Sequence, residues 1–179
     1  MTGYGISSSL GVGIDENWQN LLSLTSGLSV SNHVSSEIGK IALIASASDF
    51  VGGDRLFKLV RSAFDECVVN SKLSPPELAN TALIFAQSAP DFELIAKESE
   101  NIDKKGRTRG DTVYRTMNNY IASRLAREYQ IQAPVISNSA SCSGSALSIQ
   151  TGIAMIRAGM VDRCICCLLY TSPSPRDRG

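Results

Sequence analysis

The chain has very little histidine and few aromatic side chains. Its 179 residues include one His (His33), one Trp and 6% aromatic residues in total. Any mechanism that needs two histidines therefore cannot be completed within this chain. An excess of charge of one sign is missing too, because 17 Lys and Arg balance 17 Asp and Glu. This balance removes the electrostatic case for binding nucleic acid or an anionic membrane surface.

Long apolar runs, a secretion signal and a disulfide framework are also missing. The apolar runs are far too short to cross a bilayer. The opening residues, Met1 to Gly5, have neither the basic start nor the apolar stretch of a signal peptide. The five cysteines are odd in number and lack framework spacing. We therefore expect a reduced protein in the cytoplasm.

Two short motifs that could hold a cofactor or a metal are incomplete. Residues 3–8 resemble the start of a dinucleotide-binding fingerprint, but Ser8 stands where the third glycine belongs. Cys164 and Cys166 would share one face of a strand, yet no second pair and no nearby His supplies further ligands. We interpret these motifs as a tight turn and as core packing, and we expect no cofactor and no metal.

The remaining composition is that of an ordinary globular protein, with 43% apolar and 19% charged residues. Strand-like apolar runs alternate with segments of helical periodicity, which predicts an α/β fold with a largely parallel central sheet. We expect the chain to break at residues 74–76 and to form a loop at residues 101–111. Strands are expected at residues 40–46, 81–86, 135–138 and 161–166, the first three of them buried. Helices are expected at residues 15–28, 52–73, 90–100, 112–129 and 143–158.

The most informative residue is Cys142. It follows the β-branched pair Val135-Ile136 and a cluster of small residues, and an apolar stretch with helical spacing comes after it. Strand, tight turn, thiol and helix place the sulfur at a helix N-terminus, where unpaired N–H groups and the helix dipole stabilise a thiolate. These residues alone leave two interpretations open, a reactive nucleophile and an inert buried cysteine.

Motifs along residues 1–166 resemble the N-terminal half of a β-ketoacyl-acyl-carrier-protein synthase, a member of the thiolase-like superfamily. Residues 2–11 resemble the opening TGxGxxSxLG of that family, and Asp54-Arg55 resembles the start of its DR helix. Residues 136–162 resemble its pattern ISxACxSG…IRxGxAD.

The register of that last pattern admits two candidates for the nucleophile. Counting back from the Ser-Gly pair at residues 143–144 puts Ser141 there, whereas counting back from Gly159 puts Cys142 there without a gap. We take the second count, because a helix keeps its own register and Cys is the chemically competent residue.

The resemblance implies half of a thiolase-like α/β/α/β/α layered fold and, in the complete protein, a decarboxylating Claisen condensation. Cys142 would be the catalytic nucleophile that accepts an acyl group from acyl carrier protein, and malonyl-carrier protein would extend it in fatty-acid or polyketide-type synthesis. A homodimer or heterodimer is implied for the full length. The histidines of the second step would lie in a C-terminal half that this chain lacks, so we expect the chain alone to be inactive and to expose an apolar face.

Three alternatives come from other classes of protein. One is a non-catalytic partner subunit of the chain-length-factor kind, against which Cys142 argues because such subunits typically replace the nucleophile. Another is a thiolase or another CoA-dependent acyltransferase relative, against which the opening motif argues. A nucleotide-binding α/β module is disfavoured by the broken glycine fingerprint.

The end of the chain differs from the rest. Residues 167–179 lack periodicity and carry two Ser-Pro steps, and the run from Cys167 to Asp177 is similar to a translated transposon-derived sequencing adapter. We therefore expect two segments. Residues 1–166 would be a truncated N-terminal β-ketoacyl synthase domain, and residues 167–179 a non-native tail.

Overall fold

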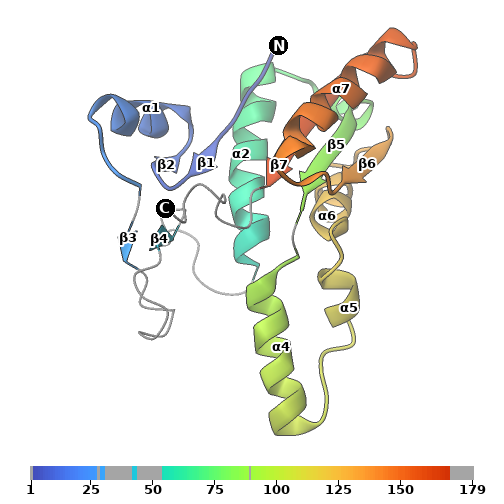
Figure 1. Ribbon diagram of the computed structural model, residues 1–179. Helices are drawn as coiled ribbons and strands as arrows, with labels where there is room; N and C mark the ends of the chain where they lie inside the picture. The colour runs from blue at the N-terminus through green and yellow to red at the C-terminus, as the bar shows by residue number, and fades with distance from the viewer. Residues whose placement is uncertain (1, 28, 31–41, 44–53, 89, 170–179) are drawn as a thin grey trace. The chain divides into compact units, whose positions relative to one another are not determined.

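The computed structural model describes the whole chain except residues 1, 28, 31–41, 44–53, 89 and 170–179 (Figure 1). The chain divides into two compact units, Met1–Leu73 and Ser74–Gly179, and each is described by itself. His33, most of the strand expected at residues 40–46 and the end of the expected tail lie outside the described residues.

Within its described residues, the first unit contains two short antiparallel strand pairs and two helices. Strands β1 (Ser7–Ser8) and β2 (Gly11–Val12) pair antiparallel, as do β3 (Ser29–Val30) and β4 (Ala42–Leu43). Helix α2 (Arg55–Ser71) confirms the helix expected at residues 52–73, and it buries Phe57, Val60 and Phe64 on one side.

Helix α1 (Ile14–Leu22) is shorter than the helix expected at residues 15–28, and its buried side is not the apolar one. Its buried residue is Asn17, whose side-chain amide donates to the Gly11 and Gly13 carbonyls at 2.9 and 2.7 Å. Hydrogen bonds to the hairpin, and not apolar contacts, thus decide which side faces inward. The apolar side chains of the stretch expected as a helix are exposed, namely Trp18, Leu21, Leu22 and Leu24.

The second unit is built on a three-stranded parallel sheet with the strand order β6-β5-β7. Its strands are β5 (Ala82–Gln87), β6 (Val135–Asn138) and β7 (Cys164–Leu169). All six residues of β5 are buried, because this strand has a neighbour on each side and a helix on each face. The sheet confirms the expected α/β class with parallel strands.

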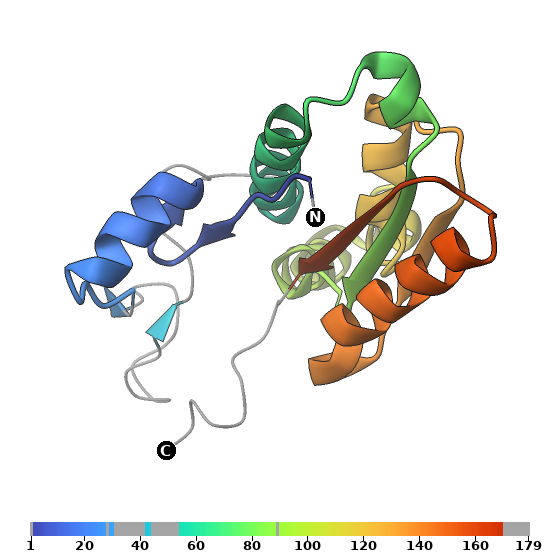
Figure 2. The same ribbon diagram turned by 90° about the horizontal axis from the view of Figure 1, so that it is seen from above.

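Helix α7 (Gly144–Arg157) covers one face of the sheet and α6 (Tyr120–Glu128) the other (Figure 2). Successive side chains of a strand point to opposite faces. Ala82 and Ile84 pack with Met155 of α7, so Leu83 and Phe85 point toward α6. The opposite side of α7 is apolar and open to solvent, as expected, with Ile149, Ile153 and Ile156 exposed.

A short helix that the sequence analysis missed follows the paired prolines. Helix α3 (Pro75–Ala79) begins after Ser74, which forms a capping box with Glu77. The Ser74 hydroxyl and N–H donate to the Glu77 carboxylate at 2.7 and 3.0 Å, and Arg163 pairs with the same carboxylate at 2.9 Å. These partners, the Ser74 hydroxyl foremost, lower the pKa of Glu77. The Ser-x-x-Glu spacing was the available signal.

Helix α4 (Phe92–Lys105) begins later and ends later than the helix expected at residues 90–100. Asp91, not Pro90, caps it by accepting the Leu94 N–H at 2.9 Å. It continues to Gly106, whose positive φ of 63° ends it in the usual glycine conformation. The loop expected at residues 101–111 is therefore half helix.

The single helix expected at residues 112–129 is two helices, α5 (Thr112–Arg115) and α6. Residues 116–119 separate them, and they include the adjacent Asn118 and Asn119. Asparagine side chains compete with backbone hydrogen bonds and weaken a helix interior. Asn118 instead bonds outside its own helix, as described below.

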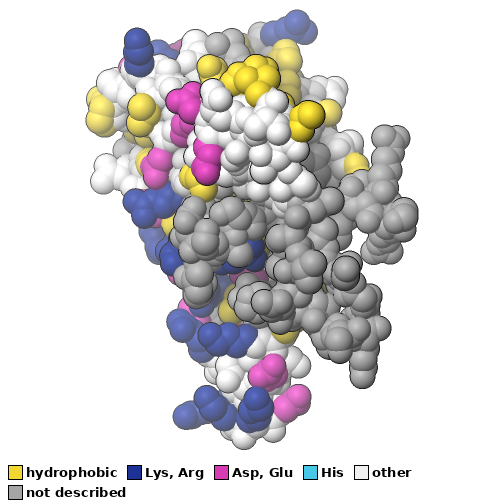
Figure 3. All heavy atoms as spheres, turned by 90° about the vertical axis from the view of Figure 1, so that its left-hand side faces the viewer, with side chains coloured by type: hydrophobic (Ala, Val, Ile, Leu, Met, Phe, Trp, Pro, Cys, Tyr) yellow, Lys and Arg dark blue, Asp and Glu magenta, His cyan; other side chains and the backbone are white. Residues whose placement is uncertain are grey.

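Two strand predictions also need correction. β6 has the expected bounds but lies at the edge of the sheet, with Val135 37% exposed, so it is not the buried strand expected there. β7 lies about half a strand later than residues 161–166. On the face of the molecule shown in Figure 3, side chains of both charge signs occur among polar and apolar ones.

Candidate active site

Cys142 lies where the sequence predicts, between a strand and a helix N-terminus. It is the middle residue of a short 3-10 turn, Ser141–Ser143, which joins the end of β6 to the start of α7. Its side chain is exposed. A reagent or substrate in solution can therefore reach the sulfur, so the thiol is not buried in this chain.

The turn that carries Cys142 is tight. Ser141 has a φ of 48°, in the left-handed region that costs a residue with a side chain roughly 1–2 kcal/mol. Ser143 closes the turn by donating from both its N–H and its hydroxyl to the Ala140 carbonyl, at 3.1 and 2.8 Å. Backbone strain of this kind persists only where surrounding contacts hold the segment, and it is common at functional sites.

Close packing fixes the end of the turn where α7 begins. A Cβ placed on Gly144 would lie 3.0 Å from the Cβ of Ala86 in β5, tighter than an ordinary contact. One turn later, buried Ser148 accepts a hydrogen bond from the Asn138 amide at 2.8 Å. The side-chain oxygen Oδ1 of Asn138 accepts the Ala140 N–H at 3.4 Å. The start of α7 is thus pinned to the ends of β5 and β6.

A second set of bonds fixes the beginning of the turn. Asn118 donates from Nδ2 to the Ser139 hydroxyl at 2.9 Å, and that hydroxyl donates to the Gln87 carbonyl at 2.9 Å. Sequence reasoning placed Asn118 in the helix before the active-site strand but did not assign a role to Ser139. Only the fold brings these three residues together.

Ser141, the nucleophile under the other register, lies next to Cys142 in the same turn and is also exposed. The position of the turn therefore suits either residue. The chemical difference between them favours Cys142, since a thiol is a far better nucleophile than an unassisted hydroxyl.

Two cysteines of β7 lie against α7; Cys164 is partly buried, whereas Cys166 is exposed, which does not fit the expected core packing. The Cys164 and Cys166 thiols both point at α7 and lie 3.7 and 3.4 Å from the Gly152 and Ser148 carbonyl oxygens, which confirms that they share one face. Burial raises the pKa of both thiols, and for Cys166 the neighbouring Cys164 adds to it. Cys67 on α2, expected in the core, is partly buried with its pKa raised by burial.

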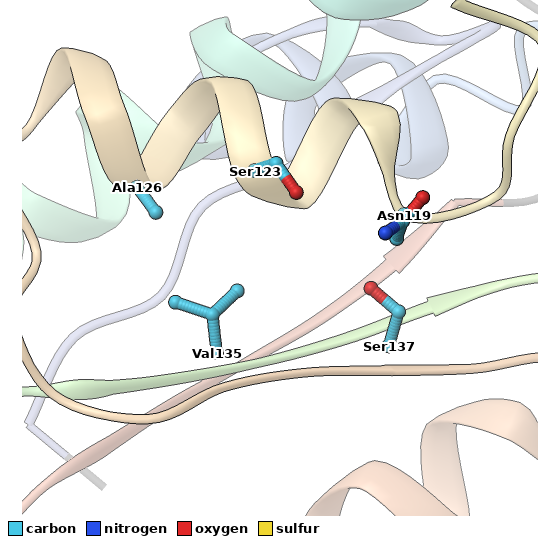
Figure 4. A pocket seen from close by; sticks show the side chains of 5 residues that line it. All are labelled: Asn119, Ser123, Ala126, Val135 and Ser137. Atoms are coloured by element: carbon cyan, nitrogen blue, oxygen red, sulfur yellow. The ribbon is translucent and has the colours of Figure 1, made fainter. Parts of the chain in front are cut away.

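A shallow pocket lies between α6 and β6, on the face of the sheet opposite α7 (Figure 4). Its lining side chains approach one another across the gap, from Asn119, Ser123 and Ala126 on one wall and Val135 and Ser137 on the other. They are small and mostly polar, and they include no titratable group.

Two searches of the described residues bear on other classes of site. In the part of the chain that the structure describes, no group of three His, Cys, Asp or Glu side chains could hold a metal ion. Over the same residues, no helix combines the length and apolarity that a bilayer crossing requires.

The solved structures that this chain resembles share its fold. The structure of the ishigamide ketosynthase/chain length factor matches with a TM-score of 0.80 and 20% identity, over 99% of this chain and 48% of that one. A type II PKS acyl-carrier protein in complex with its ketosynthase bound to the hexaketide matches with a TM-score of 0.81 and 17% identity, over 99% of this chain and 46% of that one. This chain therefore spans about half the length of each matched chain.

The sequence comparisons agree with the fold. No curated protein matches the chain. The sequence model described as "Beta-ketoacyl synthase, N-terminal domain" matches residues 1–177. With the parallel sheet and the strand–turn–helix around Cys142, this match shows that the chain belongs to the β-ketoacyl synthase family, through its N-terminal domain.

Proposed function

We propose that Cys142 is the acyl-accepting nucleophile of a condensing enzyme. The observation that carries the proposal is an exposed thiol in a tight turn directly before a helix, in a chain of the β-ketoacyl synthase family. The other described thiols lack this combination, because Cys67 lies within helix α2 and Cys164, Cys166 and Cys167 lie within strand β7.

The first half-reaction is a transfer between two thiols. The Cys142 thiolate attacks the carbonyl carbon of an acyl thioester, and a C–S bond to Sγ forms as the bond to the donor sulfur breaks. The donor leaves as a thiolate and takes up the proton that Cys142 released. Amide groups at the start of a helix have no partner within it, so they can stabilise the oxyanion that forms on the way.

The second half-reaction forms the carbon–carbon bond. A malonyl thioester loses CO₂, and its carbanion attacks the acyl carbon on Cys142, which leaves as a thiolate. By resemblance to the family, more than one histidine would donate to the malonyl carbonyl in this step, whereas the chain has a single His, His33. We therefore expect acyl transfer to Cys142 without condensation by these 179 residues.

Acyl carrier protein is the proposed donor, with a homodimer or heterodimer as the full-length assembly. The support is that one matched structure is a ketosynthase in complex with its acyl-carrier protein. A non-catalytic subunit is the second candidate, since another matched structure is a ketosynthase/chain length factor. The thiol at Cys142 favours the catalytic subunit.

The test is acylation of the chain by an acyl-carrier protein, read by mass spectrometry of the peptide that contains residues 139–157. We expect one acyl group on this peptide, removable by neutral hydroxylamine as a thioester is. Cys142→Ala should abolish it, and Ser141→Ala should retain it. An acyl group that resists hydroxylamine and is absent from Ser141→Ala would show that Ser141 is the nucleophile. A wild-type chain that carries no acyl group would reject the proposal.

A further inference from the structure

We propose that Asn118 and Ser139 are positioning residues that hold the Cys142 turn in the geometry needed for acyl transfer. The inference rests on the proposed role of Cys142 and extends it to two residues that do not touch the reacting atoms. Asn118 comes from the break between α5 and α6, and Ser139 is the residue after β6.

The hydrogen-bond directions are fixed by chemistry. A backbone carbonyl only accepts, so the Ser139 hydroxyl must give its one proton to Gln87 O, 2.9 Å away. Its oxygen is then available as an acceptor, and Asn118 supplies the N–H at 2.9 Å. The result is a chain of two bonds that runs from the α5–α6 break through Ser139 to the end of the central strand.

These two hydrogen bonds anchor the beginning of the turn, at Ser139, whereas α7 anchors its end. The far side is held by Gly144 against Ala86 and by Asn138 against Ser148. Between the two anchors lies Ser141 in its left-handed conformation, followed at once by Cys142. Losing the Ser139 anchor would let this strained residue relax, which moves the thiol that follows it.

The Asn118–Ser139 hydrogen bond coincides with an interruption between helices α5 and α6. Residues 112–129 have helical periodicity, yet the helix stops at Arg115 and restarts at Tyr120. Asn118 lies in that interruption and sends its amide to Ser139, outside its own segment. A continuous helix would be the simpler solution for this stretch, so the break has a use in the tertiary structure.

The experiment compares two properties of Cys142 in the full chain. Acyl transfer from acyl-carrier protein needs the thiol in one orientation, whereas alkylation by iodoacetamide needs only an exposed thiol. In Asn118→Ala and in Ser139→Ala we expect acyl transfer to fall about tenfold, with alkylation changed less than about twofold. Asn118→Asp should behave like Asn118→Ala, because a carboxylate cannot donate, and Ser139→Thr should recover most of the rate.

Two controls keep the result interpretable. Asn80→Ala removes a comparable exposed amide bond, from Nδ2 to the Pro76 carbonyl at 3.0 Å, and should leave both rates unchanged. The double variant Asn118→Ala with Ser139→Ala should lose no more than one single variant, because both remove the same chain of bonds. Equal loss of acylation and alkylation, or additive losses, would overturn the positioning role.

A readout that does not need acylation separates this inference from the proposed function. Hydrogen exchange of the amides at residues 139–143 should speed up several-fold in Asn118→Ala but not in Asn80→Ala. If the wild-type chain is not acylated, the proposed function fails and exchange alone decides the inference. Unchanged exchange in Asn118→Ala would then reject it.

Discussion

The tight packing of Gly144 of α7 against the sheet gives a prediction that can be worked out in magnitude. A methyl group added at Gly144 would meet the Ala86 Cβ at 3.0 Å, and neither atom is at the end of a flexible side chain. Overpacking of this kind costs about 1–3 kcal/mol. The helix propensity of alanine recovers less than about 1 kcal/mol, because Gly144 is the first residue of α7. We therefore expect Gly144→Ala to lower the free energy of unfolding by about 1–2 kcal/mol.

Removing the methyl group of Ala86 tests whether its contact with position 144 is the cause of this loss of stability. Ala86→Gly alone should cost about 1–2 kcal/mol, from a lost buried methyl and a flexible glycine in a strand. The double variant Ala86→Gly with Gly144→Ala should cost less than the sum by about 1 kcal/mol, since each change removes the problem made by the other. Gly110→Ala, with no atom within 4 Å of its added Cβ, is the matched control and should be nearly neutral.

The assay must follow the second unit, because the single Trp, Trp18, lies in the first. Hydrogen exchange of the β5 amides, measured against urea concentration, gives the free energy of opening of the sheet directly. Additive losses in the double variant, or a neutral Gly144→Ala, would refute the close contact as the reason for glycine at this position.

Two further predictions concern ionisable groups. Glu98 is buried on α4, and its pKa is lowered by hydrogen bonds from the Thr108 hydroxyl first and the Arg109 N–H second. At pH values above the ordinary glutamate pKa, ionised Glu98 therefore stabilises the loop after α4. This stabilisation is lost as the pH falls through the lowered pKa of Glu98. In Glu98→Gln, hydrogen exchange at residues 107–112, corrected for intrinsic rates, should be nearly independent of pH over the acidic range in which Glu98 is protonated. If exchange in this variant still rises at acidic pH as it does in the wild-type chain, Glu98 is not the group that stabilises the loop. Cys164, which is partly buried and has its pKa raised by burial, should react with iodoacetamide several-fold more slowly in the native chain than in urea at pH 7. The difference between the two rates should narrow toward alkaline pH, and equal rates in the native and unfolded chains would show that this thiol is not protected.

The elements best predicted from the sequence are those with local signals. The periodicity of α2 and the short apolar run of β5 gave type and position, because burial on one side or on both faces leaves its pattern in consecutive residues. The place of Cys142 followed from the same kind of signal, a strand and a helix separated by small residues. The resemblance to β-ketoacyl synthases is confirmed by the family match.

The features that were missed depend on partners distant in the chain. Whether Val135 is buried depends on the order of the strands, which no local pattern encodes. Asn118, in the break before α6, bonds to Ser139, which lies 21 residues later in the chain. The inward side of α1 is chosen by the hydrogen bonds of Asn17, against the apolar pattern of the helix.

The origin of residues 167–179 stays a prediction. Cys167, Leu168 and Leu169 pair with β5 as the end of β7, which says nothing about the gene that encodes them, and residues 170–179 lie outside the described part. Sequencing the locus beyond the codon for Cys166 checks the expectation. A genomic reading frame that continues through these thirteen residues to Gly179 would reject it.

The strand order has a consequence for how the chain is made on the ribosome. β5 lies at the centre of the sheet but is synthesised before both of its neighbours, and the first of these, β6, ends at the residue before Ser139, which lies 52 residues beyond Gln87. At roughly 5–20 residues per second, translation leaves β5 without either ladder partner for roughly 3–10 seconds. During that interval the unpaired N–H and C=O groups of this largely apolar strand can pair with another nascent chain. β5, which is fully buried in the folded protein, is thus exposed to incorrect strand pairing while the chain is being synthesised.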